Sequence, residues 1–233
     1  MKNSSPITER ILFEDNHIIV VQKMPGEISQ GDKTGDPSIP DLLKLHLKKK
    51  YNKPGNVFLG VVQRIYRPVG GVMVFARTSK ALSRLNDAVR TGKFNKTYLA
   101  VTHGVPPESE GQLKHLLAKN QKLNKSFVSD SNDKFAKEAI LNYRHIASSD
   151  RYHLIEVDLL TGRHHQIRVQ LAASGCIIKG DLKYNAPRSN PDGSISLMAW
   201  KLEFEHPVSK EMMEFRAKLP DEEPWQTLGE ELK

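Results

Sequence analysis

The segment VVQRIYRPVGGVMVFART, from Val61 to Thr78, combines two apolar runs with a polar centre. The flanking residues, Val57–Ile65 and Val72–Ala76, are rich in Val, Ile and Phe, and this composition is typical of buried strands. The segment therefore predicts two neighbouring strands joined by a short polar connection. Neighbouring antiparallel strands are a hallmark of folds that keep strands and helices in separate stretches of chain.

The connection between these predicted strands has unusual side chains for a turn. It places two cations, Arg64 and Arg67, on either side of an aromatic hydroxyl, Tyr66. An arginine at the end of an apolar strand lies near the core, where its charge needs a partner. We therefore expect an anion close to this turn.

The rest of the chain extends the same pattern outward. Three antiparallel strand pairs and one further strand are predicted at Arg10–Lys23, Lys137–Ala147 with Arg151–Leu160, Ile195–Pro207 with Glu211–Pro220, and Lys96–Gly104. Helices are predicted at Ser38–Tyr51, Ser79–Gly92 and within Thr161–Gly175, the last after an initial turn. This pattern predicts an α+β fold. We expect one domain over residues 10–222, with short tails at 1–9 and 223–233.

Composition restricts the class of protein. The 233 residues are 38% hydrophobic and 27% charged, and no stretch approaches the length of a membrane span. The first ten residues, MKNSSPITER, have no apolar core typical of a secretory signal. Cys176 is the single cysteine, so no internal disulfide can form. Together these features predict a cytoplasmic protein without a membrane partner.

The charge balance indicates a polyanionic partner. The net charge is +8 and the isoelectric point is near 9.4, which favours nucleic acid. Lys44–Lys53 holds five lysines and Leu113–Ser126 holds four. Such runs are most often solvated faces, but two of them near predicted strands could also border a groove.

Several common kinds of site are not indicated. The sequence contains neither a Walker-type phosphate loop nor a Gly-rich dinucleotide motif. His164 and His165 are adjacent, so they would point in different directions on a helix, and no metal site is expected. Cys176 is interpreted as a small buried residue, and no Ser-His-Asp spacing stands out.

A second group of basic side chains lies in TGRHHQIR, at the start of a predicted helix. Arg163, His165, Gln166 and Arg168 surround a helix N-terminus, which attracts phosphate or carboxylate. Ile167 and Leu171 place the same helix against the core, so Arg168 needs an anionic partner. One shared anionic site, made by a side chain or an RNA phosphate, would satisfy both this arginine and Arg64.

Four stretches of the sequence resemble the recurring motifs of the RluA-type RNA pseudouridine synthases. They are QRIYRPVGGVMVFART, NKTYLAVTHG, LLTGRHHQIRVQLAASGCIIKGDLKY and LMAWKLEFEHP, and ILFEDNHIIVVQKMPG resembles the opening segment of that family. The resemblance covers about Ile11 to Leu219. It implies a mixed, mainly antiparallel sheet flanked by helices, with a central basic cleft for a flipped uridine. The implied reaction breaks the N-glycosidic bond, turns the uracil and rejoins it through carbon, without metal or organic cofactor.

The resemblance also assigns roles to individual positions. Where the family has His-Arg-Leu-Asp, this chain has Gln63 to Tyr66, so Tyr66 occupies the place of the catalytic aspartate. Arg64 is expected to help displace the flipped base, and Tyr98 matches the tyrosine that stacks on it. Arg168 matches the arginine that pairs with the aspartate. Gln170 replaces a family histidine.

The replacement at Tyr66 changes the chemistry. A carboxylate is almost fully ionised at pH 7, whereas a phenol is ionised only on the order of one part in a thousand. Neither Asp158 nor Asp181 is expected to substitute. Three hypotheses follow: an RNA-binding family member with impaired or no isomerase activity, an active synthase using Tyr66 or another residue, and a protein-interaction module that does not bind RNA.

The site expected from the sequence has two parts. The catalytic group comprises Tyr66, Tyr98 and Arg168. The RNA-binding group comprises Arg64, Arg67, Lys96, Arg163, His165, Lys48, Lys49 and Lys50. We expect a monomer whose partner is ribosomal or transfer RNA, and the sequence leaves open which uridine is recognised.

Overall fold

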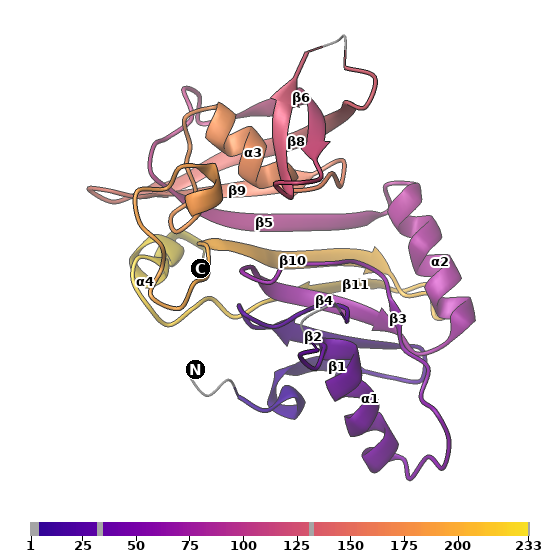
Figure 1. Cartoon of the computed structure of the whole chain (residues 1–233). Coiled ribbons are helices and arrows are strands. Elements are labelled where there is room, and N and C mark those ends of the chain that lie inside the picture. Colours follow the sequence, from indigo (N-terminus) through magenta and orange to yellow (C-terminus); the bar gives the residue numbers. More distant parts are fainter. Residues whose placement is uncertain (1–4, 32–34, 131–132, 233) are drawn as a thin grey trace. The chain divides into compact units, whose positions relative to one another are not determined.

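The computed structural model describes residues 5–31, 35–130 and 133–232 (Figure 1). The chain divides into two compact units. One comprises residues 1–96 and 199–218, here the first unit, and the other comprises 97–198 and 219–233, the second unit. Most strand pairs are antiparallel, and the described residues form four α-helices, so the predicted α+β class is confirmed. That residues 10–222 act as one domain stays a prediction.

The first unit contains a sheet with the strand order β1-β2-β4-β10. Its strands are β1 (Ile11–Glu14), β2 (Ile18–Lys23), β4 (Gly70–Ala76) and β10 (Leu197–Glu205, in this unit from Ala199), with β11 (Met212–Arg216) paired to β10 and the short β3 (Gly60–Val61) paired to β4. The turn η1 (Ile7–Arg10) and the helices α1 (Ile39–Lys50) and α2 (Ser79–Arg90) complete the unit.

Local sequence explains these elements well. The predicted hairpin forms between β1 and β2, where the Asp15 carboxylate accepts hydrogen bonds from the amides of His17 and Ile18 at 2.8 and 2.7 Å. Ser38 and Asp41 form a capping box that begins α1. All seven residues of β4 are buried, as expected for an apolar strand covered on both faces.

The second unit contains a sheet with the order β5-β9-β8-β6-β7. Its strands are β5 (Phe94–Thr102, in this unit from Thr97), β6 (Glu110–Asn120), β7 (Lys125–Ser129), β8 (Lys137–Ser148) and β9 (His153–Leu159). Its helical segments are α3 (Gln166–Ala173), η2 (Leu182–Tyr184), α4 (Trp225–Leu228) and η3 (Gly229–Leu232). The predicted pairing of β8 with β9 is confirmed, as is the turn before α3.

One sequence-based expectation was wrong, and one hairpin was not expected. Only Gly60 and Val61 of the predicted strand Val57–Ile65 are in a sheet. Beyond them, hydrogen bonds to side chains replace strand pairing: the Ser29 hydroxyl donates to the Ile65 carbonyl, and the Gln63 side chain donates to the Val72 carbonyl. The lysine-rich run Leu113–Ser126 forms most of the β6–β7 hairpin, and its Lys114, Lys119 and Lys122 side chains are exposed. Lysine is depleted in strands, which hid this hairpin from propensity arguments.

No helix in the described part of the chain combines the length and apolar character needed to cross a membrane.

Candidate functional site

The turn from Gln63 to Val69 in the first unit presents three side chains to solvent. Arg64, Tyr66 and Arg67 are exposed, with 39% of Tyr66 accessible, whereas Ile65 between them is buried at 4%. The Ser29 hydroxyl donates a hydrogen bond to the Ile65 carbonyl at 3.0 Å. The buried isoleucine thus anchors a turn whose neighbours on both sides point outward.

A buried lysine supports this turn from inside. Lys23, at the end of β2, is fully buried, and its Nζ donates to the carbonyl oxygens of Met24, Arg67 and Val69 at 3.1, 3.2 and 2.6 Å. Burial lowers the pKa of Lys23 to about 7, although the nearby Glu27 carboxylate acts in the opposite direction. Sequence reasoning missed this residue, and the one available signal was a lysine directly after the apolar run of β2.

The Arg67 side chain forms contacts within the first unit. Its Nε donates to the Gly26 carbonyl at 3.0 Å, the Gly26 amide donates back to the Arg67 carbonyl at 2.8 Å, and its guanidinium pairs with Asp36. Gly71, the second residue of β4, has a φ of +129°, and a Cβ there would lie 2.2 Å from the Ala199 carbonyl oxygen. This glycine is therefore required by both backbone conformation and space.

Arg168 in the second unit has the anionic partner that its position required. Its Nε and one terminal nitrogen donate to the two carboxylate oxygens of Asp181, each at 2.6 Å. The two side chains are only 7% and 1% exposed, and the guanidinium lies 5.0 Å from the centre of the Tyr184 ring. The expectation that Arg168 needs an anion is confirmed, and Asp181 supplies it.

His165 completes this cluster as a neutral ring. The remaining Arg168 nitrogen donates to His165 Nε2 at 3.0 Å, so Nδ1 carries the proton and donates to the Tyr184 hydroxyl, also at 3.0 Å. Burial and the Arg168 charge lower the pKa of His165 to about 2. The His164 ring stacks on it at 4.0 Å, and burial together with Lys119 lowers the pKa of His164 to about 4. Neither histidine adds positive charge at pH 7.

The other predicted residues have simpler surroundings. Arg163 is exposed and its Nε donates to the Glu138 carbonyl at 2.8 Å. Tyr98 is half-buried in β5 opposite Val157. Lys96 is also half-buried, and burial lowers its pKa.

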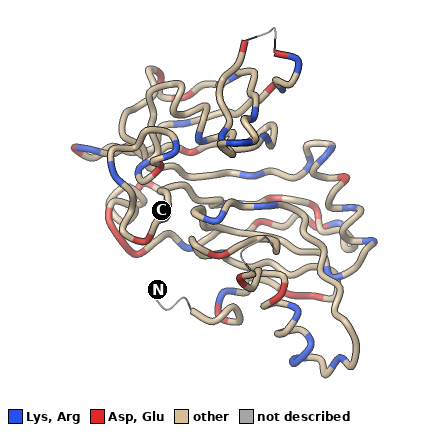
Figure 2. Tube along the Cα trace, viewed as in Figure 1, with Lys and Arg blue, Asp and Glu red and all other residues tan. Residues whose placement is uncertain are grey.

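The lysines at the end of α1 differ from one another. Lys48 and Lys49 are exposed, whereas Lys50 also donates to Glu14 at 3.0 Å (Figure 2 shows the basic residues gathered there). Lysine near a helix C-terminus also favours the helix dipole, so this run has a structural role of its own. Its contact with RNA stays a prediction.

The structure thus gathers the predicted residues into two groups. One is the turn with Arg64, Tyr66 and Arg67, and the other is the buried cluster with Arg168 and His165. Because these groups belong to different units, the prediction that Arg64, Tyr98 and Arg168 border one basic cleft stays a prediction.

The side-chain amides of two glutamines donate to backbone carbonyls. The Gln63 Nε2 donates to the Val72 carbonyl at 3.0 Å, and Gln170 Nε2 donates to the Leu113 carbonyl at 3.0 Å. Both side-chain amides therefore form hydrogen bonds with the backbone.

Comparison with known proteins agrees with the geometry. The sequence pattern of the family described as RNA pseudouridylate synthase matches residues 17–173. Ribosomal large subunit pseudouridine synthase C of Rickettsia bellii is 32% identical over 79% of this chain and 59% of its own length. Synthase D of Zymomonas mobilis is 29% identical over 91% of this chain and 69% of its own length.

The fold has a close counterpart among solved structures. Human RNA Pseudouridylate Synthase Domain Containing 4 superposes with a TM-score of 0.76 at 24% identity, covering 92% of this chain and 90% of that one. This likeness shows the fold alone, while the family pattern covers well over half of the chain. The chain therefore belongs to the RNA pseudouridylate synthase family, among its RluA-type members.

Proposed function

We propose that this protein binds RNA through the family site and that its isomerisation step is impaired or absent, because Tyr66 stands where the family has its catalytic aspartate. The observation that carries the proposal is the turn itself. It is anchored by Lys23 and Ser29, and it presents Tyr66 between two exposed arginines. No residue from Gln63 to Val69 is acidic, so the turn has no carboxylate of its own.

The surroundings of Arg168 support the same reading. In the family this arginine is expected to neutralise the catalytic aspartate. Here Asp181 accepts hydrogen bonds from Nε and one terminal nitrogen at 2.6 Å, the other terminal nitrogen donates to His165, and the ion pair is buried. Because Asp181 already balances its charge, Arg168 would do little to stabilise an ionised phenol at Tyr66 and so to lower the pKa of that hydroxyl.

RNA is the partner because the exposed charge favours a polyanion. Arg64, Arg67 and Arg163 are exposed, and the chain carries a net charge of +8. RNA of the large ribosomal subunit is the first substrate to test, since two relatives bear that name. Transfer RNA is the second, and the protein is proposed to act as a cytoplasmic monomer.

The experiment measures tritium release from C5-labelled uridine in ribosomal RNA fragments. The wild type and the variants Tyr66→Phe and Tyr66→Asp are compared, with Tyr51→Phe as a matched control at another exposed tyrosine. We expect little release by the wild type, no further loss in Tyr66→Phe, and a measurable gain in Tyr66→Asp, which restores a carboxylate.

Robust release by the wild type that disappears in Tyr66→Phe but not in Tyr51→Phe would overturn the proposal. Tyr66 would then be a catalyst in an active synthase. RNA binding is measured separately by fluorescence anisotropy. An affinity that does not change between low and high salt would instead favour a module that does not bind RNA.

A further inference from the structure

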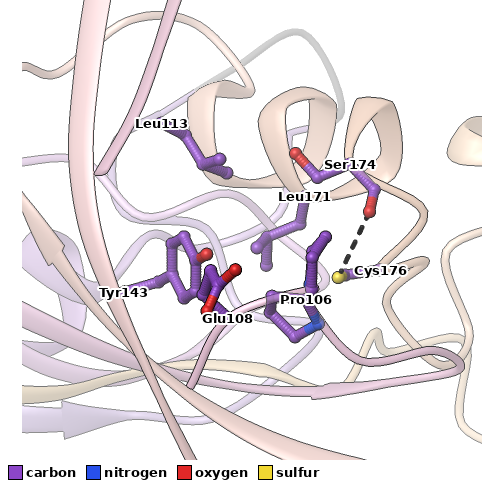
Figure 3. Close-up of a pocket in the computed structure, with 8 residues that line it drawn as sticks. Pro106, Glu108, Leu113, Tyr143, Leu171, Ser174 and Cys176 are labelled. Carbon is purple, nitrogen blue, oxygen red and sulfur yellow. Dashed lines mark hydrogen bonds between the residues drawn. The ribbon is translucent and has the colours of Figure 1, made fainter. Parts of the chain in front are cut away.

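The second unit contains a cavity that the pseudouridine synthase site does not use. Its volume is about 320 Å³. It lies between the connection that follows β5, the strands β6 and β8, and the end of α3 (Figure 3). The lining residues are Pro106, Pro107, Glu108, Leu113, Tyr143, Leu171, Ser174 and Cys176.

The wall of this cavity is mostly hydrocarbon. Leu113 and Leu171 form part of it together with two prolines, and Cys176 adds a buried sulfur atom. An apolar cavity of about 150 Å³ is enough to hold benzene. One about twice as large accommodates an apolar body of roughly ten non-hydrogen atoms, such as a bicyclic aromatic ring.

Two polar groups at the cavity lack a protein partner. Tyr143 is only 9% exposed, and within residues 5–31, 35–130 and 133–232 its hydroxyl forms no hydrogen bond with another residue. Figure 3 shows its ring beside the carboxylate of Glu108. Glu108 is exposed, so water reaches its carboxylate, which has no ion-pair partner in that part of the chain. It is also the one charged residue lining the cavity.

The position of Tyr143 is built into the sheet. It faces Gly111 across the β6–β8 pair, and a Cβ at Gly111 would lie 2.9 Å from the tyrosine hydroxyl. The glycine therefore leaves room for the ring to reach the cavity. Burial, with smaller contributions from Cys176 and Glu108, raises the pKa of Tyr143, so the hydroxyl stays neutral at pH 7.

We propose that this cavity binds a small organic ammonium ion with an aromatic or branched apolar body. The body packs against Leu113 and Leu171, the ammonium pairs with the Glu108 carboxylate, and the Tyr143 hydroxyl accepts one of its N–H groups. Binding is non-covalent. Burial raises the pKa of the Cys176 thiol to about 11, and its Sγ lies 3.6 Å from the Ser174 carbonyl. The thiol therefore lines the cavity but does not act as a nucleophile.

The preference for a positively charged ligand follows from the one charged side chain at the cavity. The chain as a whole is basic, yet the charged group at this cavity is a carboxylate. An anionic ligand would meet Glu108 directly and be repelled. A neutral ligand without a hydrogen-bond donor would leave the buried Tyr143 hydroxyl without a partner.

The test uses tryptamine as the probe and isothermal titration calorimetry on the full chain as the measurement. The neutral analogue 3-ethylindole and the acid indole-3-propionate have similar bodies and different charges. We expect tryptamine to bind at least ten times more tightly than either one. Glu108→Gln should remove that preference, whereas Glu110→Gln, at a neighbouring glutamate outside the cavity, should keep it.

A second set of variants locates the binding. Ser174→Phe fills the cavity from the end of α3 and should abolish tryptamine binding. If that variant does not fold, Leu113→Phe, which fills the same cavity from β6, serves the same purpose. Equal affinity for charged and neutral probes, an unchanged affinity in Glu108→Gln, or no heat at millimolar tryptamine would each overturn the proposal.

Discussion

The pair of Arg168 and Asp181 can be tested by removing one charge at a time. Asp181→Asn keeps the size of the side chain and removes the negative charge, which leaves the arginine buried at 7% exposure without its counter-ion. The two hydrogen bonds of 2.6 Å are each worth about 1.5–3 kcal/mol because both groups are charged. Breaking a buried pair from one side typically costs about 3–5 kcal/mol, and we expect a loss in that range.

The assay is urea unfolding followed by circular dichroism. With a denaturant slope of about 2–3 kcal/mol per molar urea, the midpoint should fall by about 1–2.5 M in Asp181→Asn. Arg168→Met should be similarly destabilised, and the double variant should lose clearly less than the sum of the two. Arg163→Met, an exposed arginine in the same segment, should cost below about 1 kcal/mol.

Two results would refute this reasoning. One is a loss below about 1 kcal/mol in Asp181→Asn, and the other is additivity of the two single variants within about 0.5 kcal/mol. Either would mean that the pair is not coupled in solution. If the pair holds, RNA affinity should fall less in Arg168→Met than in Arg64→Met, because Asp181 and not a phosphate balances Arg168.

Three further predictions follow from the same structure. Gly71→Ala should destabilise the protein by more than about 2 kcal/mol in urea unfolding, since the new methyl group meets the Ala199 backbone at a positive φ; wild-type stability would show that the strand can shift. Reversing charge at Lys48 and Lys49 should flatten the dependence of RNA affinity on salt, and an unchanged slope would remove the end of α1 from the RNA-binding surface. The folded pKa of His165 lies far below its unfolded value of 6.5, so the unfolded chain takes up the extra proton and stability should fall as pH drops from about 7 toward 5. If the urea midpoint of His165→Gln falls between pH 7 and pH 5 as much as that of the wild type, another group is responsible for the loss of stability.

The sequence alone determined much of the local structure and the family. The β1–β2 hairpin, the helices α1 and α2, and the pairing of β8 with β9 all follow from short-range patterns of apolar, turn and capping residues. The motif around TGRHHQIR indicated the family, because its side chains are close together along the chain. It also indicated that Arg168 needs an anion, since a guanidinium near a core cannot remain unpaired.

Only the tertiary structure decided which groups meet. Asp181 lies 13 positions from Arg168, and nothing in the local pattern distinguishes it from other aspartates as the counter-ion. Two of the three carbonyls that bind Lys23 come from a turn more than 40 residues away, so that support was not visible in sequence. Other long-range hydrogen bonds, from Ser29 to the Ile65 carbonyl and from Gln63 to the Val72 carbonyl, occur where the predicted strand Val57–Ile65 does not continue beyond Val61. Hydrophobic periodicity specifies which face of an element is buried, but the fold chooses the partner for each buried charge, because that choice depends on distances between segments remote in sequence.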